Sequence, residues 1–294
     1  MNVVTTLRTQ FARHAPQLEE RVERGRWRLR NRSRAYSADS LEPQLETLVS
    51  RLKRDGVLIT DVETVFADAT SFESAAEQAR SLYRQPRQEL DADAGSKATF
   101  LTKLATGSYD ADDPFVRLAL HPNALAVANG YLRLHSTLRS LDLWLTQPTP
   151  GPAIQTQLWH RDADDVMNVK MFVYFTDVTR AAGPLCYAPG THPLGPLRDL
   201  PERDEQARST DEQLARIAPE RDWVLCEGKP GTVVFADTCG YHKQLKPEGD
   251  ERLLLVAHYV SGTPFVPHAL EIRGADAGAL TDEQHVAVFD RSRS

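Results

Sequence analysis

Apolar residues recur every three or four positions in the N-terminal part of the chain, which is the spacing of one face of a helix. Such a stripe is formed by Leu41, Leu45, Leu48 and Leu52. Gly56 is expected to end that helix, and residues 57–60 to form a short buried strand. Further helices are predicted over residues 71–83 and 122–132. Residues 1–135 are therefore predicted to be a helical part with one early strand, packed on a core.

From about Ser136 the pattern changes to short runs rich in β-branched and aromatic residues, separated by Pro and Gly clusters. We expect strands over residues 138–146, 154–160, 169–175, 223–226, 232–236 and 252–260. Because no helices alternate with these strands, a sandwich or barrel is favoured over a parallel α/β sheet. The predicted fold class is mainly β with flanking helices. Residues 136–262 would form the β core and residues 263–294 a C-terminal extension.

Composition and charge narrow the class of protein. The chain has 294 residues, 41% of them hydrophobic and 26% charged, which is typical of a globular protein. The net charge of −6 argues against a dedicated nucleic-acid binder, and no apolar run is long enough for a transmembrane helix. The three cysteines, an odd number without close spacing, predict reduced thiols; they are Cys186, Cys226 and Cys239. With no secretory signal visible, the expected location is the cytoplasm.

Three polar residues in the β half suggest a metal site. His160 and Asp162 lie two positions apart at the end of a predicted strand, so both side chains would point to the same face. A His-x-Asp sequence alone is a weak signal, because it occurs by chance in many proteins. His242 follows a strand and a glycine-containing turn. Two histidines and one carboxylate can occupy one face of an octahedral ion, as in non-haem Fe(II) oxygenases. The alternative for His242 is a hydrogen-bonded surface residue.

Arg252 opens the last predicted apolar strand, ten residues after His242. A guanidinium at the start of a buried strand needs a partner, because an unpaired buried charge is unfavourable. Its planar fork matches a carboxylate in a bidentate way. In a dioxygenase this partner would be the distal carboxylate of 2-oxoglutarate. The alternative is an internal salt bridge to an Asp or Glu residue.

Four separated motifs resemble the phytanoyl-CoA dioxygenase family in their order and spacing. They are His160-x-Asp162, Gly183-Pro184-Leu185 leading to Pro189-Gly190-Thr191-His192, Pro230-Gly231-Thr232 with His242, and Arg252. The match covers about residues 136–262, and residues 52–59 resemble the family's early strand.

The resemblance implies a double-stranded β-helix core, a cupin-like jelly roll with helices packed on one side. It implies that His160, Asp162 and His242 bind Fe(II), that Arg252 anchors 2-oxoglutarate, and that O2 is consumed. The reaction implied is hydroxylation of an unactivated C–H bond of a small molecule, with release of succinate and CO2. His192 lies outside the metal triad of the family.

Lys170, Phe172 and Tyr174 alternate on one face of the next predicted strand. If this face is inward, Phe172 lies where the family places an aromatic side chain against 2-oxoglutarate. Lys170 would be a second cation near the cosubstrate or substrate, or else an edge residue whose amine reaches solvent. His258 is either a pocket residue or a core histidine, and Asp164 either a substrate contact or a solvated loop carboxylate.

Asp162 also bears on the type of reaction. Halogenases of this kind carry a small residue in place of the carboxylate so that chloride can bind, and the carboxylate here favours hydroxylation or a related oxidation. Two other classes of protein remain as alternatives. One is a catalytically inactive jelly-roll binding protein, and the other is a cupin-type metal protein that does not use 2-oxoglutarate. The pattern specifies neither the structure of the substrate nor an oligomeric state.

Residues 198–221 form a charged insertion between the predicted strands. Thr210 and Gln213 have capping-box spacing and predict a short helix through Ile217. Leu214 and Ile217 would lie on one face of that helix. The insertion is predicted to be a lid over the pocket, with a passive surface excursion as the alternative.

Overall fold

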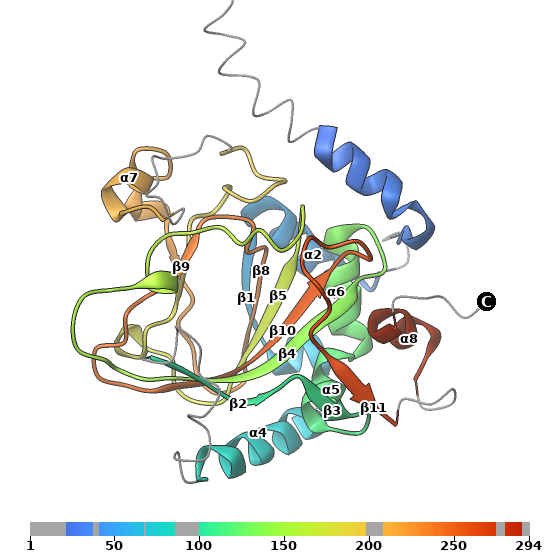
Figure 1. Cartoon of the computed structure of the whole chain (residues 1–294), viewed down its shortest axis with the longest axis horizontal. Coiled ribbons are helices and arrows are strands. Elements are labelled where there is room, and N and C mark those ends of the chain that lie inside the picture. The colour runs from blue at the N-terminus through green and yellow to red at the C-terminus, as the bar shows by residue number, and fades with distance from the viewer. Residues whose placement is uncertain are drawn as a thin grey trace, which may run out of the picture.

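The computed structural model describes residues 22–37, 41–67, 69–85, 100–197, 208–274 and 280–289. A large antiparallel sheet and a small one form its centre, and helices cover one face of the large sheet (Figure 1). The loop predicted at residues 91–96 lies outside the described residues, as do residues 198–207 of the charged insertion.

The large sheet has six strands in the described part of the chain, and every neighbouring pair is antiparallel. Their order is β1 (Val57–Asp61), β8 (Thr232–Ala236), β5 (Val169–Tyr174), β10 (Arg252–Val260), β4 (Thr137–Thr146) and β2 (Leu101–Thr106). The small sheet has the order β7 (Val224–Leu225), β6 (Leu185–Tyr187) and β9 (His242–Gln244). A separate parallel pair joins β3 (Ser108–Asp110) to β11 (Glu271–Arg273). The chain passes repeatedly between the two main sheets, which is the arrangement of a jelly roll, and the predicted fold class is confirmed.

Side-chain alternation along β10 separates the two faces of the large sheet. One face joins the main core under the helices, and its β10 members are Leu253, Leu255, Ala257 and Tyr259. The opposite face carries Leu254 and Val256, which contact a smaller cluster that includes Tyr187 of the small sheet. The large sheet is therefore buried on both faces, and its second face lines the space between the sheets.

The helices are α2 (Pro43–Asp55), α3 (Val62–Phe66), α4 (Ala69–Tyr83), α5 (Pro114–Ala119), α6 (Pro122–Leu132), α7 (Asp211–Ala215) and α8 (Asp282–Phe289), and residues 22–30 are also helical. Three leucines of the predicted stripe, Leu45, Leu48 and Leu52, are buried on α2, whereas Leu41 precedes the helix and is half-buried. Gly56 caps this helix with a left-handed φ of 78°. A Cβ there would lie 2.5 Å from His192 Nδ1 and from Tyr187 Oη, so only glycine fits.

The described residues of the N-terminal part form three strands rather than the single strand that the sequence predicted. β1 is the expected strand, but β2 and β3 were missed. In β2 the pairing with β4 shifts between Lys103 and Ala105, which breaks the apolar alternation that identifies a strand. Both edges of the large sheet, β1 and β2, come from this part of the chain.

The cysteines are buried and free, as predicted. No helix in the described ranges is both long and apolar enough to cross a membrane.

Asp237 is a buried carboxyl between β8 and β9, and it makes stability depend on pH. Tyr131 Oη donates to its Oδ2 at 2.5 Å and the Cys239 N–H to its Oδ1 at 2.9 Å, but burial raises the pKa of Asp237 to about 6. Since the native state then holds a proton that the unfolded chain releases near pH 4, this contribution to stability is lost as the pH rises through 6.

We compare the free energy of unfolding of the native protein with that of Asp237→Asn. The difference, native minus variant, is expected to fall by about 2.5 kcal/mol between pH 4 and pH 7. Urea denaturation of both proteins across this range measures the difference, in which the other carboxylates cancel. A difference independent of pH would contradict the raised pKa.

Candidate metal centre

His160 reaches the space between the sheets by a different backbone path from the predicted one. Residues 154–160 do not form a strand: Gln155–Gln157 is a 3-10 turn, and Gln155 has a φ of 51°. The Gln157 side chain accepts the Ile154 N–H and closes this turn, so the apolar run does not extend. Only Trp159 and His160 pair, with Ser209 and His242 respectively.

Backbone pairing brings the three predicted metal ligands together. The amides of His160 and His242 each donate to the other's carbonyl at 3.0 Å, and the Asp162 N–H donates to Thr238 O at 2.8 Å. The segment that carries the first two ligands is therefore bonded to the loop and strand that carry the third. In this way residues far apart in the sequence present their side chains to one point.

The ligand atoms of His160, Asp162 and His242 lie within 4.8 Å of one another. Nε2 of His160 is 3.8 Å from Asp162 Oδ1, and Nε2 of His242 is 3.9 Å from Asp162 Oδ2. Nδ1 of His160 lies 2.9 Å from Leu158 O and Nδ1 of His242 lies 3.0 Å from Gly240 O. These carbonyls orient both rings and leave Nε2 facing Asp162, which is the outer hydrogen bonding expected of metal-binding histidines.

The protonation of the site also suits a metal. Burial lowers the pKa of His160 to about 2, helped by His242 beside it, and burial lowers the pKa of His242 as well. Both imidazoles are therefore neutral at physiological pH, the form that binds a metal. Burial opposes ionisation of Asp162, but the Lys170 ammonium holds the pKa of Asp162 well below its usual range.

Lys170 contacts the metal carboxylate. Its Nζ lies 2.5 Å from Asp162 Oδ2, and both side chains are largely buried. Lys170, Phe172 and Tyr174 share one face of β5, as predicted, and the structure shows that this face lines the pocket. Its ion pair with Asp162 means that Lys170 is not an edge residue whose amine reaches solvent.

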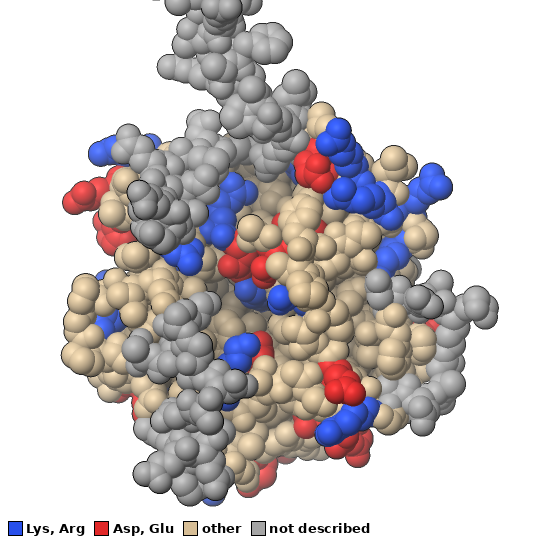
Figure 2. All heavy atoms as spheres, in the orientation of Figure 1, with Lys and Arg blue, Asp and Glu red and all other residues tan. Residues whose placement is uncertain are grey.

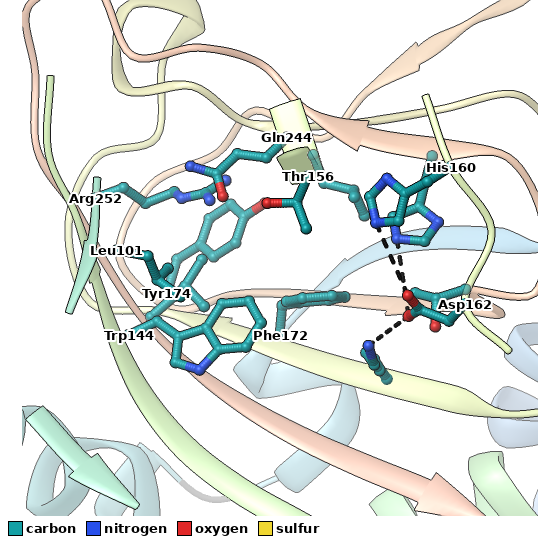
Figure 3. Close-up of a pocket in the computed structure, with 14 residues that line it drawn as sticks. Leu101, Trp144, Thr156, His160, Asp162, Phe172, Tyr174, Gln244 and Arg252 are labelled. Atoms are coloured by element: carbon teal, nitrogen blue, oxygen red, sulfur yellow. Dashed lines mark hydrogen bonds and ion pairs between the residues drawn. The ribbon is translucent and has the colours of Figure 1, made fainter. Parts of the chain in front are cut away.

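Arg252 lies at the other end of the same pocket, with Phe172 and Tyr174 between it and the triad (Figure 3). Its side chain is buried, its Nε has no partner, and its Nη2 donates to Thr146 Oγ1 at 3.5 Å. Burial lowers the pKa of Arg252 to about 10, so the group stays positive at neutral pH. No described carboxylate forms an ion pair with it. The internal salt bridge considered from the sequence is therefore absent from the described structure.

Gln244 adds a second unsatisfied donor at this end, because its buried Nε2 also has no partner. Figure 3 shows its side chain beside Arg252. Buried donors without partners are rare and mark places where a ligand completes the hydrogen bonds. A carboxylate satisfies both groups, so the residues present fit 2-oxoglutarate.

The structure also places the other side chains that the sequence singled out. Phe172 lines the pocket, as does Trp144. His258 is buried, and its Nδ1 lies 3.8 Å from Asp164 Oδ2, so these two residues face each other beside Lys170. His192 lies outside the triad, where its Nε2 contacts the carbonyl of Lys53 at the end of α2.

Sequence reasoning missed several pocket residues. Gln244 is two positions after His242 on β9, so period-two alternation could have identified it. Leu101 reaches the pocket from β2, a strand that the sequence pattern did not reveal. Thr156 comes from the 3-10 turn that replaces the predicted strand.

The described part of the charged insertion is attached next to His160. The predicted helix is α7, with the capping box between Thr210 and Gln213, but it ends at Ala215 rather than Ile217. Leu214 is fully buried against a cluster that includes Trp159, and the Trp159 Nε1–H donates to Asp211 at 2.6 Å. In the orientation of Figure 1, a hollow with acidic and basic side chains opens in this face of the molecule (Figure 2). That residues 198–221 act as a lid stays a prediction.

A jelly roll that holds two neutral histidines and one carboxylate at a common point, with an anion anchor in the same pocket, defines a non-haem iron oxygenase that uses 2-oxoglutarate. The sequence model of the phytanoyl-CoA dioxygenase (PhyH) family matches residues 52–243. The chain belongs to this family, and iron and 2-oxoglutarate are the cofactors of the site. No curated protein sequence matches the chain.

Several solved structures share this fold. The epimerase SnoN in complex with Fe3+, alpha ketoglutarate and nogalamycin RO is 21% identical, with a TM-score of 0.54 over 81% of this chain and 93% of that one. EctD from S. alaskensis with 2-oxoglutarate and 5-hydroxyectoine is 20% identical, with a TM-score of 0.55 over 81% and 83%. The carbocyclase SnoK from nogalamycin biosynthesis is 19% identical, with a TM-score of 0.50 over 84% and 94%. At these identities the likeness establishes the fold.

Lys170→Met is expected to weaken metal binding by about 10–100-fold, the range typical of partners that orient a metal ligand. Without the ammonium, Asp162 loses both its orientation and the charge that keeps it ionised. Titration with Co(II) or Mn(II) measures the affinity without requiring turnover. A selective rise in the 2-oxoglutarate requirement, with metal affinity unchanged, would instead place Lys170 at the cosubstrate.

Proposed function

We propose that the protein hydroxylates an unactivated C–H bond of a small molecule, using Fe(II), 2-oxoglutarate and O2. The observation that carries this proposal is the arrangement within one pocket. Unsatisfied donors of Arg252 and Gln244 lie at one end, and the metal triad lies at the other.

Each part of the pocket has a separate task in this reaction. His160, Asp162 and His242 would hold the iron, and Arg252 with Gln244 would bind the distal carboxylate of 2-oxoglutarate. Phe172 and Leu254 line the space between these ends and exclude water from it. When iron, 2-oxoglutarate and O2 are bound, they supply the oxidation: one oxygen atom enters the substrate C–H bond, the other enters succinate, and CO2 leaves.

Asp162 supports hydroxylation over halogenation. Its carboxylate supplies the third protein ligand, the place that a halide needs in order to bind. Lys170 holds this carboxylate on the side of the two histidines. Lys170 is thus proposed as a positioning residue for the iron, in place of the cosubstrate contact that the sequence suggested.

A screen of small molecules with the iron-loaded protein, 2-oxoglutarate and isotopically labelled O2 tests this function. We expect succinate to form in step with a product that gains one labelled oxygen atom, with or without chloride present. A chlorinated product would overturn the argument from Asp162. A product that loses two hydrogen atoms, or keeps its mass with inverted stereochemistry, would assign cyclisation or epimerisation instead. No conversion of 2-oxoglutarate with any compound, at full iron occupancy, would favour an inactive binding protein.

A further inference from the structure

A second concave site, separate from the metal pocket, lies between the helix of residues 22–30, the end of α2 and the segment that follows α6. It is a groove of about 620 Å³, which is within the size range of small-molecule sites. We name it the basic groove, because four cations line it: Arg28, Arg32, Lys53 and Arg133. No described residue that lines it is acidic, although the whole chain has a net charge of −6.

In the described part of the chain, no acidic side chain neutralises the cations of the basic groove. Within the described residues, none of the four forms an ion pair. The same helix shows the contrast, because Arg26 and Arg30 both pair with Glu23, at 3.8 and 2.9 Å. The helix therefore has one neutralised side and one side, with Arg28, that adds positive charge to the groove. Figure 2 shows Lys and Arg side chains gathered over this helix, at the upper right.

Lys53 and Arg133 come from different elements and lie close enough to repel each other. Lys53 is half-buried in the last turn of α2, and burial, together with Arg133, lowers its pKa. Like charges held together in a concave surface raise the local potential, and an anion that binds there relieves the repulsion.

The backbone conformation of Arg133 is a second, independent indication that the basic groove is a functional site. Arg133 ends α6 with a φ of 59°, in the left-handed region where glycine or asparagine is preferred. A non-glycine residue in this conformation costs free energy, and such residues cluster at functional sites. Arginine at this position makes the fold less stable than glycine would. Its guanidinium, however, lines the groove.

The floor of the groove is apolar. Leu132, Leu134 and Met167 line it and are buried, and Leu194 lies at the edge. Guanidinium groups bind phosphate oxygens in a bidentate way, and an apolar floor accepts an organic group. Four cations around an apolar floor are suited to bind a small organic molecule with several negative charges. They are less suited to bind a flat charged surface.

We propose that the basic groove binds an organic diphosphate or triphosphate, at a site distinct from the 2-oxoglutarate pocket. The proposal does not depend on the reaction proposed above. Titration of the full-length chain with inorganic pyrophosphate and with ADP, without added iron, tests it by calorimetry. We expect one site per chain, affinity that falls with salt, and no displacement by saturating 2-oxoglutarate.

Charge-reversing variants locate the site. Lys53→Glu and Arg133→Glu are each expected to weaken ADP binding by about tenfold or more. Arg51→Glu is the matched control: it lies exposed on the same helix α2, changes the net charge equally, and does not line the groove. We expect its effect to be about twofold or less.

The variant Arg133→Gly tests whether a loss of ADP binding is independent of a loss of stability. Glycine suits the φ of 59°, so this variant should be at least as stable as the native protein while it binds ADP more weakly. No binding at millimolar ADP, displacement by 2-oxoglutarate, or an equal loss of affinity in Arg51→Glu would overturn the proposal.

Discussion

His242→Ala and Asp162→Ala are each expected to abolish turnover, and His242→Ala and His160→Ala to weaken iron binding as well. The three ligand atoms lie within 4.8 Å of one another, and no other cluster of metal ligands occurs in the described residues. Structural zinc sites with four ligands bind with about 10–16 kcal/mol, or roughly 2.5–4 kcal/mol per ligand. Losing one ligand should therefore reduce metal affinity by about 100–1,000-fold.

The measurement is metal content after anaerobic loading with Fe(II), together with a Co(II) or Mn(II) titration. His192→Ala is the matched control, because His192 is also buried but contacts the end of α2. We expect this variant to unfold at lower denaturant concentration and yet to bind one metal ion with nearly native affinity. If His242→Ala bound metal as tightly as the native protein, the triad would not be the metal site.

The sequence predicted the central strands well because these strands are buried on both faces and read as continuous apolar runs. β4, β5, β8 and β10 are each found within one or two residues of the predicted bounds. The short strands β6 and β9 were not predicted, since three residues are too few to show a period. β2 was missed because its register shift interrupts the alternation.

The metal ligands were identifiable because their chemistry is local to short motifs, although the strand assumed to carry His160 does not exist. What the sequence could not supply was the pairing of side chains across strands. The sequence left open whether Lys170 faces the pocket or solvent, and its bond to Asp162 depends on how the loop after His160 folds. Likewise, only the structure shows that Arg252 has no carboxylate partner among the described residues, and this observation separates an anion anchor from a salt bridge.

Arg252→Ala is expected to raise the concentration of 2-oxoglutarate needed for half-maximal succinate formation by tens to thousands of fold. The guanidinium is buried and positive, and it lacks an acidic partner in the described structure. Its charged, bidentate contact with the cosubstrate is worth on the order of 2–5 kcal/mol when lost. Arg252→Lys should restore only part of the affinity, because an ammonium cannot form the fork.

Two comparisons make this result specific to the cosubstrate. Gln244→Ala removes one neutral donor beside Arg252 and should raise the same requirement by about 3–10-fold. Metal affinity, measured with Co(II), should stay nearly native in Arg252→Ala, because Arg252 lies at the opposite end of the pocket from the triad (Figure 3). Lys170→Met should show the reverse pattern, with weakened metal binding and a smaller effect on 2-oxoglutarate. If Arg252→Ala kept its native affinity for 2-oxoglutarate, the anchor would have to be assigned to another cation of the pocket, and Lys170 is the other described cation that lines it.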